Sequence, residues 1–174
     1  KTLFPYTTLF RSAENKNAIV LKFFVYTLFA SLFMLFSLLY VRQFADSFLI
    51  SDMIAAGSKL SQHEQTWVFA GFFIAFAVKI PIFPFHTWQP NTYSTAPMAG
   101  TMLLSAIMLK MALFGMIKWM IGLNQSALTY WQWPVIILGV IGILYGAFIA
   151  MREVNIRKVF AFASISHLGL IAAG

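Results

Sequence analysis

The chain has 174 residues, of which 60% are hydrophobic and 10% are charged, and its mean hydropathy is +0.80. Soluble domains carry about 25% charged residues, so this composition excludes a water-soluble globular protein. The 12 basic and 5 acidic residues give a net charge of +7, but charges this sparse do not form a nucleic-acid-binding surface, and we expect the basic excess to face lipid headgroups or one side of a membrane.

The first twelve residues differ from the rest of the chain. Residues 2–12, TLFPYTTLFRS, resemble the translation of a sequencing-library adapter, so we interpret residues 1–12 as a non-native leader and leave them out of the fold prediction. The remaining sequence starts abruptly at Ala13 and stops within an apolar run at 168–174. We therefore expect residues 13–174 to be an internal fragment of one larger transmembrane domain.

Five apolar segments follow, and each approaches the roughly 20 residues with which a helix crosses a bilayer. The segments lie at 18–41, 68–85, 98–120, 134–151 and 158–174. They predict an all-α, polytopic transmembrane helix bundle. A polar stretch at 44–66, with a weakly amphipathic helix near 51–60, is expected to lie at the membrane surface. Trp119, Trp131 and Trp133 stand where an interfacial aromatic belt would place them.

The basic residues predict an orientation for these spans. If the first span starts on the inside, the inside loops carry Lys16, Lys22, Arg152, Arg157 and Lys158, and the outside loops carry Arg42 and Lys59. This excess on one side satisfies the positive-inside rule.

Two lysines lie deep within predicted spans, Lys79 in the second and Lys110 at the middle of the third. Lys110 is on the order of 15 Å from either end of its helix, beyond the reach of a lysine side chain, so we expect it to face protein or trapped water. A charge at mid-membrane costs about 2.5–3.5 kcal/mol even on the lenient scale, which makes such residues functional candidates. Snorkelling, or capping of the carbonyls of a broken helix, is the structural alternative.

No carboxylate is expected near either lysine. All acidic residues lie in connectors or at span edges, namely Glu14, Asp46, Asp52, Glu64 and Glu153. Either both lysines are often neutral because they are desolvated, or their counter-charge lies on a helix outside this chain. Both alternatives suit a proton carrier.

Lys79 also stands beside a predicted helix break. Pro81 and Pro84 follow it, and an interior proline removes a backbone hydrogen bond and disfavours helix at the residue before it. Broken helices at membrane depth persist where the freed groups are buried in protein or line a hydrated cavity. The second span is therefore predicted to be discontinuous, with Lys79 as part of a polar channel.

Histidine and glycine residues add further candidates. His167 in the fifth span is a candidate proton relay, with a packing role as the alternative, and His86 is interpreted as an interfacial residue. The three scattered histidines show no metal or haem spacing. Gly139, Gly142 and Gly146 are three and four residues apart, which predicts close helix packing on one face.

The stretch 71–115, GFFIAFAVKIPIFPFHTWQPNTYSTAPMAGTMLLSAIMLKMALFG, resembles the antiporter-like membrane subunits of proton-pumping NADH:quinone oxidoreductase, respiratory complex I. Further matching motifs are KFFVYT at 22–27, GVIGILYGAFIAM at 139–151 and IRKVFAFASISHLG at 156–169. By this resemblance, Lys79 corresponds to the lysine of the discontinuous channel helix and Lys110 to the central-axis lysine of the following helix. The glutamate that pairs with the first lysine would lie on a helix before KFFVYT.

The resemblance implies proton translocation across the membrane, driven by electron transfer from NADH to quinone in other subunits. It implies no cofactor on this chain, and NADH, FMN, iron–sulfur clusters and quinone would belong to partner subunits, in accord with the lack of cysteine. The expected partners are the lipid bilayer and other membrane-arm subunits, with no nucleic acid and no small-molecule substrate beyond protons and water. The expected location is a bacterial inner membrane, or the mitochondrial inner membrane if the gene is organellar.

The chain departs from the family's common pattern at two places. Residues 89–93 read QPNTY where the family often has LPDAH, and Asn155 stands where an aspartate is common. Because these changes remove ionisable groups, we do not assign proton entry to that loop. Two other classes stay open, namely a subunit of a multisubunit sodium/proton antiporter and a structural membrane scaffold in which both lysines cap helices.

Overall fold

The computed structural model describes residues 16–123 and 125–174, so the predicted leader, Glu14 and Asn124 lie outside the described residues. The described residues form helices and no strand, which confirms the all-α prediction. In chain order the α-helices are α2 (Lys16–Arg42), α3 (Ile50–Gly57), α4 (Gln62–Lys79), α5 (Gln89–Thr95), α6 (Met98–Leu103), α7 (Leu109–Gly115), α8 (Gln125–Arg152) and α9 (Ile156–Ala173). A 3-10 turn, η1 (Phe85–Trp88), precedes α5, and the π-helical segments η2 (Leu104–Met108) and η3 (Met116–Ile121) flank α7.

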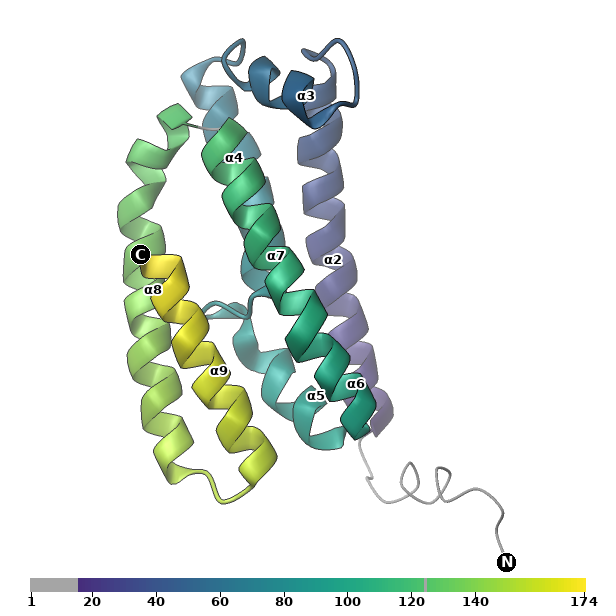
Figure 1. The fold of residues 1–174 in the computed structure, drawn as a ribbon, viewed down its shortest axis with the longest axis vertical. Helices are drawn as coiled ribbons and strands as arrows, with labels where there is room; N and C mark the ends of the chain where they lie inside the picture. The colour runs from purple at the N-terminus through teal and green to yellow at the C-terminus, as the bar shows by residue number, and fades with distance from the viewer. Residues whose placement is uncertain (1–15, 124) are drawn as a thin grey trace, which may run out of the picture.

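The long helices lie side by side, and α3 crosses them at one end of the bundle (Figure 1). Four helical stretches are long and apolar enough to cross a membrane, namely Lys16–Arg42, Met98–Ile121, Ala127–Arg152 and Ile156–Ala173. They correspond to the first, third, fourth and fifth predicted spans. The start of α2 and the turn between α8 and α9 lie at the same end of the bundle, opposite α3 (Figure 1). The segments with the predicted inside charges are therefore gathered at one end.

Two predicted spans differ in extent from the helices that contain them. The second span was expected at 68–85, but α4 runs from Gln62 to Lys79. It starts earlier because Ser61 and Glu64 form a capping box with reciprocal side-chain to backbone hydrogen bonds. The fourth span was expected to start at Pro134, but α8 starts at Gln125 and contains Pro134 within the helix, as membrane helices tolerate where neighbouring groups compensate.

Helix α4 forms the centre of the described bundle. Its phenylalanines Phe69, Phe72 and Phe73 are at most 4% exposed. Phe72 stacks on Trp119 with ring centroids 5.9 Å apart, and Phe69 stacks on Trp131 at 5.5 Å. These two tryptophans, predicted to form an interfacial belt, thus also pack against the core, because aromatic pairs gain from offset stacking as well as from burial.

Helices α8 and α9 pack through the predicted glycine face. A Cβ atom at Gly139 would lie 2.8 Å from the carbonyl oxygen of Gly169, and one at Gly146 would lie 2.8 Å from that of Phe162. These distances are too short for any side chain larger than hydrogen, so the close approach requires glycine. The prediction of close packing on this face is confirmed.

Candidate functional site

The candidate site starts at the break after α4. The helix ends at Lys79, and the chain continues through Ile80–Pro84, with a cis Phe83–Pro84 peptide bond, before η1 and α5 begin. The predicted discontinuity next to Lys79 is therefore confirmed. Its cause is local, because Pro81 has no N–H with which to continue the helix.

Two carbonyls released by the break find new partners. In a continuous helix, the carbonyl of Ala77 would accept from residue 81, which is proline; here the N–H of Ile82 donates to it at 2.9 Å. The carbonyl of Val78, the residue before Lys79, accepts instead from the indole N–H of Trp88 at 2.8 Å. A buried carbonyl without a donor is costly, so Trp88 stabilises the last turn of α4 in its broken form.

The segment after the break is also attached to α2. The ammonium of Lys22 donates to the carbonyl of Thr87 at 3.3 Å, and the hydroxyls of Tyr26 and Thr87 are 3.1 Å apart. The rings of Phe23 and Trp88 have centroids 5.2 Å apart. The motif KFFVYT therefore holds the broken segment in place, a role that the sequence pattern did not indicate.

Lys79 borders an open groove of about 690 Å³. The groove lies between α2, α4 and the continuous helical stretch Met98–Ile121, which we call the α6–α7 rod. Apart from Lys79 and Thr27, the residues lining this groove are apolar: Phe23, Met34, Phe76, Leu103, Leu104, Ile107, Met108, Met111 and Ala112. Lys79 is partly buried. Within residues 16–123 and 125–174, no carboxylate pairs with Lys79. The ion pair found among these residues joins Lys59 and Asp46, whose charged atoms are 3.9 Å apart.

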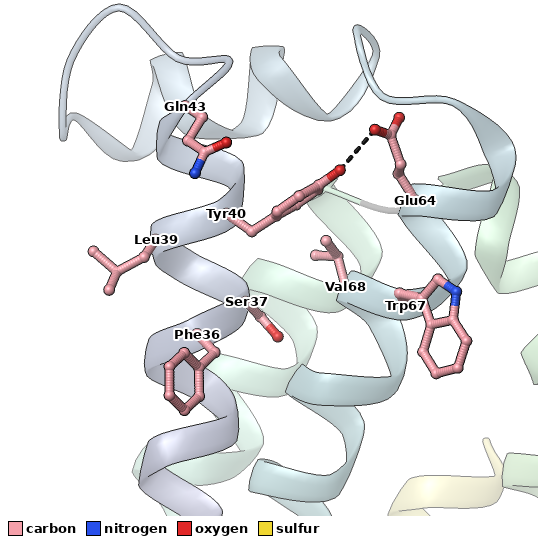
Figure 2. Close-up of a pocket in the computed structure, with 8 residues that line it drawn as sticks. All are labelled: Phe36, Ser37, Leu39, Tyr40, Gln43, Glu64, Trp67 and Val68. Carbon is pink, nitrogen blue, oxygen red and sulfur yellow. Dashed lines mark hydrogen bonds between the residues drawn. The ribbon is translucent and has the colours of Figure 1, made fainter.

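The carboxylate of α4 lies at the opposite end of the helix from Lys79. Glu64 accepts from the Tyr40 hydroxyl at 2.6 Å and from the Ser61 hydroxyl at 2.6 Å, and Figure 2 shows it beside a groove of about 540 Å³ between α2 and α4. The hydrogen bond from Ser61, followed by that from Tyr40, lowers the pKa of Glu64 to about 2. Fifteen residues of helix separate Glu64 from Lys79, or about 22 Å, so Glu64 cannot serve as its counter-charge.

Lys110 is placed differently from the prediction. It lies on α7 and is exposed on the surface of the described residues, and it does not line the groove of Lys79. The rod from α6 to η3 buries Leu109 and Ala112, whereas Met111 and Phe114 are 65% and 64% exposed. The protein contact expected for Lys110 is thus not supplied by the described part of the chain.

The histidines also differ from the predictions. His167 is exposed on α9 and is not brought to Lys79. His86, interpreted as interfacial, is instead buried at 5% exposure, with its ring 4.8 Å from that of Tyr145 and 5.5 Å from that of Phe83. Tyr145 lies on α8, far from His86 in the sequence, so no local sequence signal indicated this contact. Among the described residues, no three of His, Asp and Glu lie close enough together to hold a metal ion.

Comparison with known proteins identifies the family of this fold and site. The family described as NADH:quinone oxidoreductase/Mrp antiporter, transmembrane, matches residues 2–174. NADH-quinone oxidoreductase subunit M of Rickettsia bellii is 35% identical over 161 residues, which cover 92% of this chain and 33% of the relative. NADH-ubiquinone oxidoreductase chain 4 of Metridium senile is 36% identical over 164 residues, with 94% and 33% covered.

A solved structure gives the same result. A chain of respiratory complex I from Thermus thermophilus with bound NADH superposes with a TM-score of 0.83 and 29% identity, over 95% of this chain and 36% of that chain. The two curated relatives are a subunit M and a chain 4 protein. The chain spans about a third of the length of these relatives. It belongs to the NADH:quinone oxidoreductase/Mrp antiporter transmembrane family.

Proposed function

We propose that this chain is part of a proton-translocating subunit in the membrane arm of an NADH:quinone oxidoreductase, with Lys79 as a proton carrier. The observation that carries the proposal is the position of Lys79, at the end of a broken helix and on the border of an apolar groove. Its relatives are subunits of such oxidoreductases.

The apolar groove makes the charge state of Lys79 depend on a nearby counter-charge, which is what a proton carrier needs. An ammonium in apolar surroundings is unfavourable unless a counter-charge is near, and none of the described carboxylates is placed to supply one. A carboxylate that approaches from another part of the protein would favour the protonated amine, and its withdrawal would favour release of the proton. Movement or neutralisation of that partner would thus load and unload Lys79.

Lys110 is the second proposed carrier. We propose that protein outside this chain covers the exposed face of α7, because a lysine in the middle of a 24-residue apolar rod is costly against lipid. The relatives are about three times as long as this chain, which leaves ample protein for that contact. His167 is exposed on α9. We propose that protein outside this chain also covers His167 and that its side chain serves as a further proton relay.

The electron chemistry belongs, in this proposal, to other subunits that hold NADH, FMN, iron–sulfur clusters and quinone. This chain contributes membrane helices and proton-carrying side chains, with the lipid bilayer and neighbouring membrane-arm subunits as its partners. Protons and water are its only proposed small-molecule ligands.

The proposal is tested by Lys79→Ala and Lys110→Ala in the full-length protein of an assembled complex. Proton uptake into membrane vesicles is measured per assembled complex, with NADH as the electron donor. A positioned proton-transfer group contributes about 10²–10⁴-fold, so each variant should lower pumping by about 100-fold or to background. Lys118→Ala, a change at an exposed lysine of η3 in the same rod, is the matched control. Unchanged pumping with both Lys79 and Lys110 replaced would refute the proposal.

A subunit of a sodium/proton antiporter is the second candidate, because the family includes Mrp antiporters. In that case a sodium gradient, and not NADH oxidation, would drive proton movement in the same vesicles. The scaffold alternative expected both lysines to cap carbonyls. Neither the Lys79 nor the Lys110 ammonium donates to a carbonyl within the described part of the chain, which disfavours that alternative.

A further inference from the structure

The groove between α2 and α4 at the α3 end of the bundle has a polar end and an apolar end. Its volume is about 540 Å³, within the range of about 300–1,000 Å³ that is typical of ligand sites. Figure 2 shows Gln43 and Glu64 at the end nearer α3, Tyr40 between the two helices, and Phe36 and Trp67 at the other end. The division into two ends fits a ligand with a polar head and an apolar tail.

The two ends of the groove match the depth profile of one leaflet of a bilayer. Helix α2 ends at Arg42, so the groove occupies the last turns of this span. Seven residues separate Phe36 from Gln43, a rise of about 10 Å. A headgroup layer is about 5–8 Å thick, so Gln43 and Glu64 lie at the level of the headgroups when Phe36 reaches the acyl chains. Trp67, 68% exposed, stands at the boundary, where tryptophan is enriched.

Glu64 supplies a fixed negative charge at the polar end. Its Oε1 atom accepts from the Tyr40 hydroxyl at 2.6 Å, and its Oε2 atom accepts from the hydroxyl and the N–H of Ser61 at 2.6 and 2.8 Å. A carboxylate has about four acceptor positions, so one position stays free, on Oε1. All three donors are neutral, and no lysine or arginine of the described residues pairs with Glu64. The polar end therefore suits a ligand that brings a positive charge and a hydrogen-bond donor.

We propose that this groove binds a phospholipid with a primary-amine headgroup, whose ammonium donates to Glu64 and whose acyl chain lies along Phe36 and Leu39. An ethanolamine ammonium has three N–H donors, as a lysine ammonium does. A choline headgroup has the charge but no N–H, and a glycerol headgroup leaves a net negative lipid that Glu64 repels. The amide of Gln43 has two N–H groups with which it can donate to the lipid phosphate.

A lysine or arginine on another protein segment would also match the charge of Glu64, but the rest of the groove favours lipid. Phe36 is 68% and Leu39 is 47% exposed. Of the four apolar helical stretches in the described residues, α2 is the least buried, and a surface of large apolar side chains along a whole span is typical of contact with lipid. The lipid site does not depend on the proposed proton role of Lys79.

The test uses the full-length protein in the assembled complex, reconstituted into nanodiscs of phosphatidylethanolamine, phosphatidylcholine and phosphatidylglycerol. Photoactivatable ethanolamine and choline lipids with the same diazirine-bearing acyl chain are added in trace amounts, and labelled peptides are quantified by mass spectrometry. Exposed ion pairs are weak, so the ethanolamine probe should label residues 36–43 and 64–68 about twofold to fivefold more than the choline probe.

The change Glu64→Gln should remove this preference. Glu153→Gln, the same chemical change in the turn between α8 and α9 at the other end of the bundle, is the matched control and should leave it intact. Equal labelling by the two probes in the wild type would overturn the proposal whether or not the variants assemble. Labelling by neither probe, while both label other parts of the complex, would show that protein covers the groove and would also overturn it. An unchanged preference in Glu64→Gln would refute the role of the carboxylate.

Discussion

Trp88 offers the most direct test of how the broken helix positions Lys79. Its side chain is 1% exposed, and its indole N–H donates to the carbonyl of Val78 at 2.8 Å. The change Trp88→Phe keeps an aromatic ring against Phe23 but removes the donor. Leaving a buried carbonyl unsatisfied costs about 1–3 kcal/mol, and the smaller ring leaves a cavity that adds to this cost.

The loss should reach Lys79 because Val78 directly precedes it. Without the indole, the Val78 carbonyl must find another partner, and the last turn of α4 changes with it. Displacing a group that takes part in a proton transfer by about 1 Å can cost 10²-fold in rate. We therefore expect Trp88→Phe to lower the unfolding temperature of the subunit and to reduce pumping by about 10-fold to 100-fold.

The assay uses the full-length protein in the assembled complex and measures thermal unfolding and NADH-driven proton uptake per complex. Trp67→Phe is the matched control, because Trp67 lies on the same helix as Lys79 and is 68% exposed (Figure 2). If Trp88→Phe and Trp67→Phe give the same unfolding temperature and the same pumping, the indole does not hold the break and the reasoning is refuted.

Two further predictions concern the packing and the polar end of the bundle. Gly146→Ala should destabilise the α8–α9 pair by about 1–3 kcal/mol in thermal or denaturant unfolding, because the new methyl group would lie 2.8 Å from the Phe162 carbonyl oxygen. The control Gly100→Ala should be close to neutral, because the nearest atom to its new methyl group would be 3.7 Å away. Equal effects of the two changes would contradict this. Glu64 has a pKa lowered from 4.5 to about 2, so its contribution to stability is fully present above about pH 4.5 and is lost as the pH falls through about 2. The unfolding temperatures of the wild type and Glu64→Gln should therefore differ most above pH 4.5 and converge toward pH 2. The change Tyr40→Phe removes one of the hydrogen bonds that lower the pKa of Glu64, so it should bring that pKa closer to 4.5 and narrow the pH interval over which this stabilisation is lost. A difference independent of pH would show that the carboxylate charge is not involved.

The features that could be predicted from the sequence follow from local covalent constraints. Pro81 cannot donate to the helix ladder, so a break next to Lys79 follows from the residue type alone, and α4 does end there. Glycines three and four residues apart bring backbones close together wherever their helix packs, as Gly139 and Gly146 do. Neither prediction requires knowledge of the partner segment.

The features that could not be predicted depend on contacts between distant segments. His86 belongs to the break, but its burial comes from Tyr145 on α8. Trp88 looks like an interfacial tryptophan until Val78 is placed within reach of its indole. The exposure of Lys110 follows from which face of its rod packs on α4, and hydropathy cannot specify that face when residues on both sides are apolar.

The relation between the two lysines depends on one close contact between their helices. A Cβ atom at Gly115 would lie 2.7 Å from the ring of Phe76, and that ring is 4% exposed and stacked on Phe72, so it has little room to turn away. Lys79 follows Phe76 by three residues and shares its face of α4. Glycine at 115 thus lets α7 approach α4 beside the groove of Lys79 while Lys110, five residues earlier, stays on the outer side. The α6–α7 rod therefore lies between the groove that Lys79 borders and the exposed side chain of Lys110.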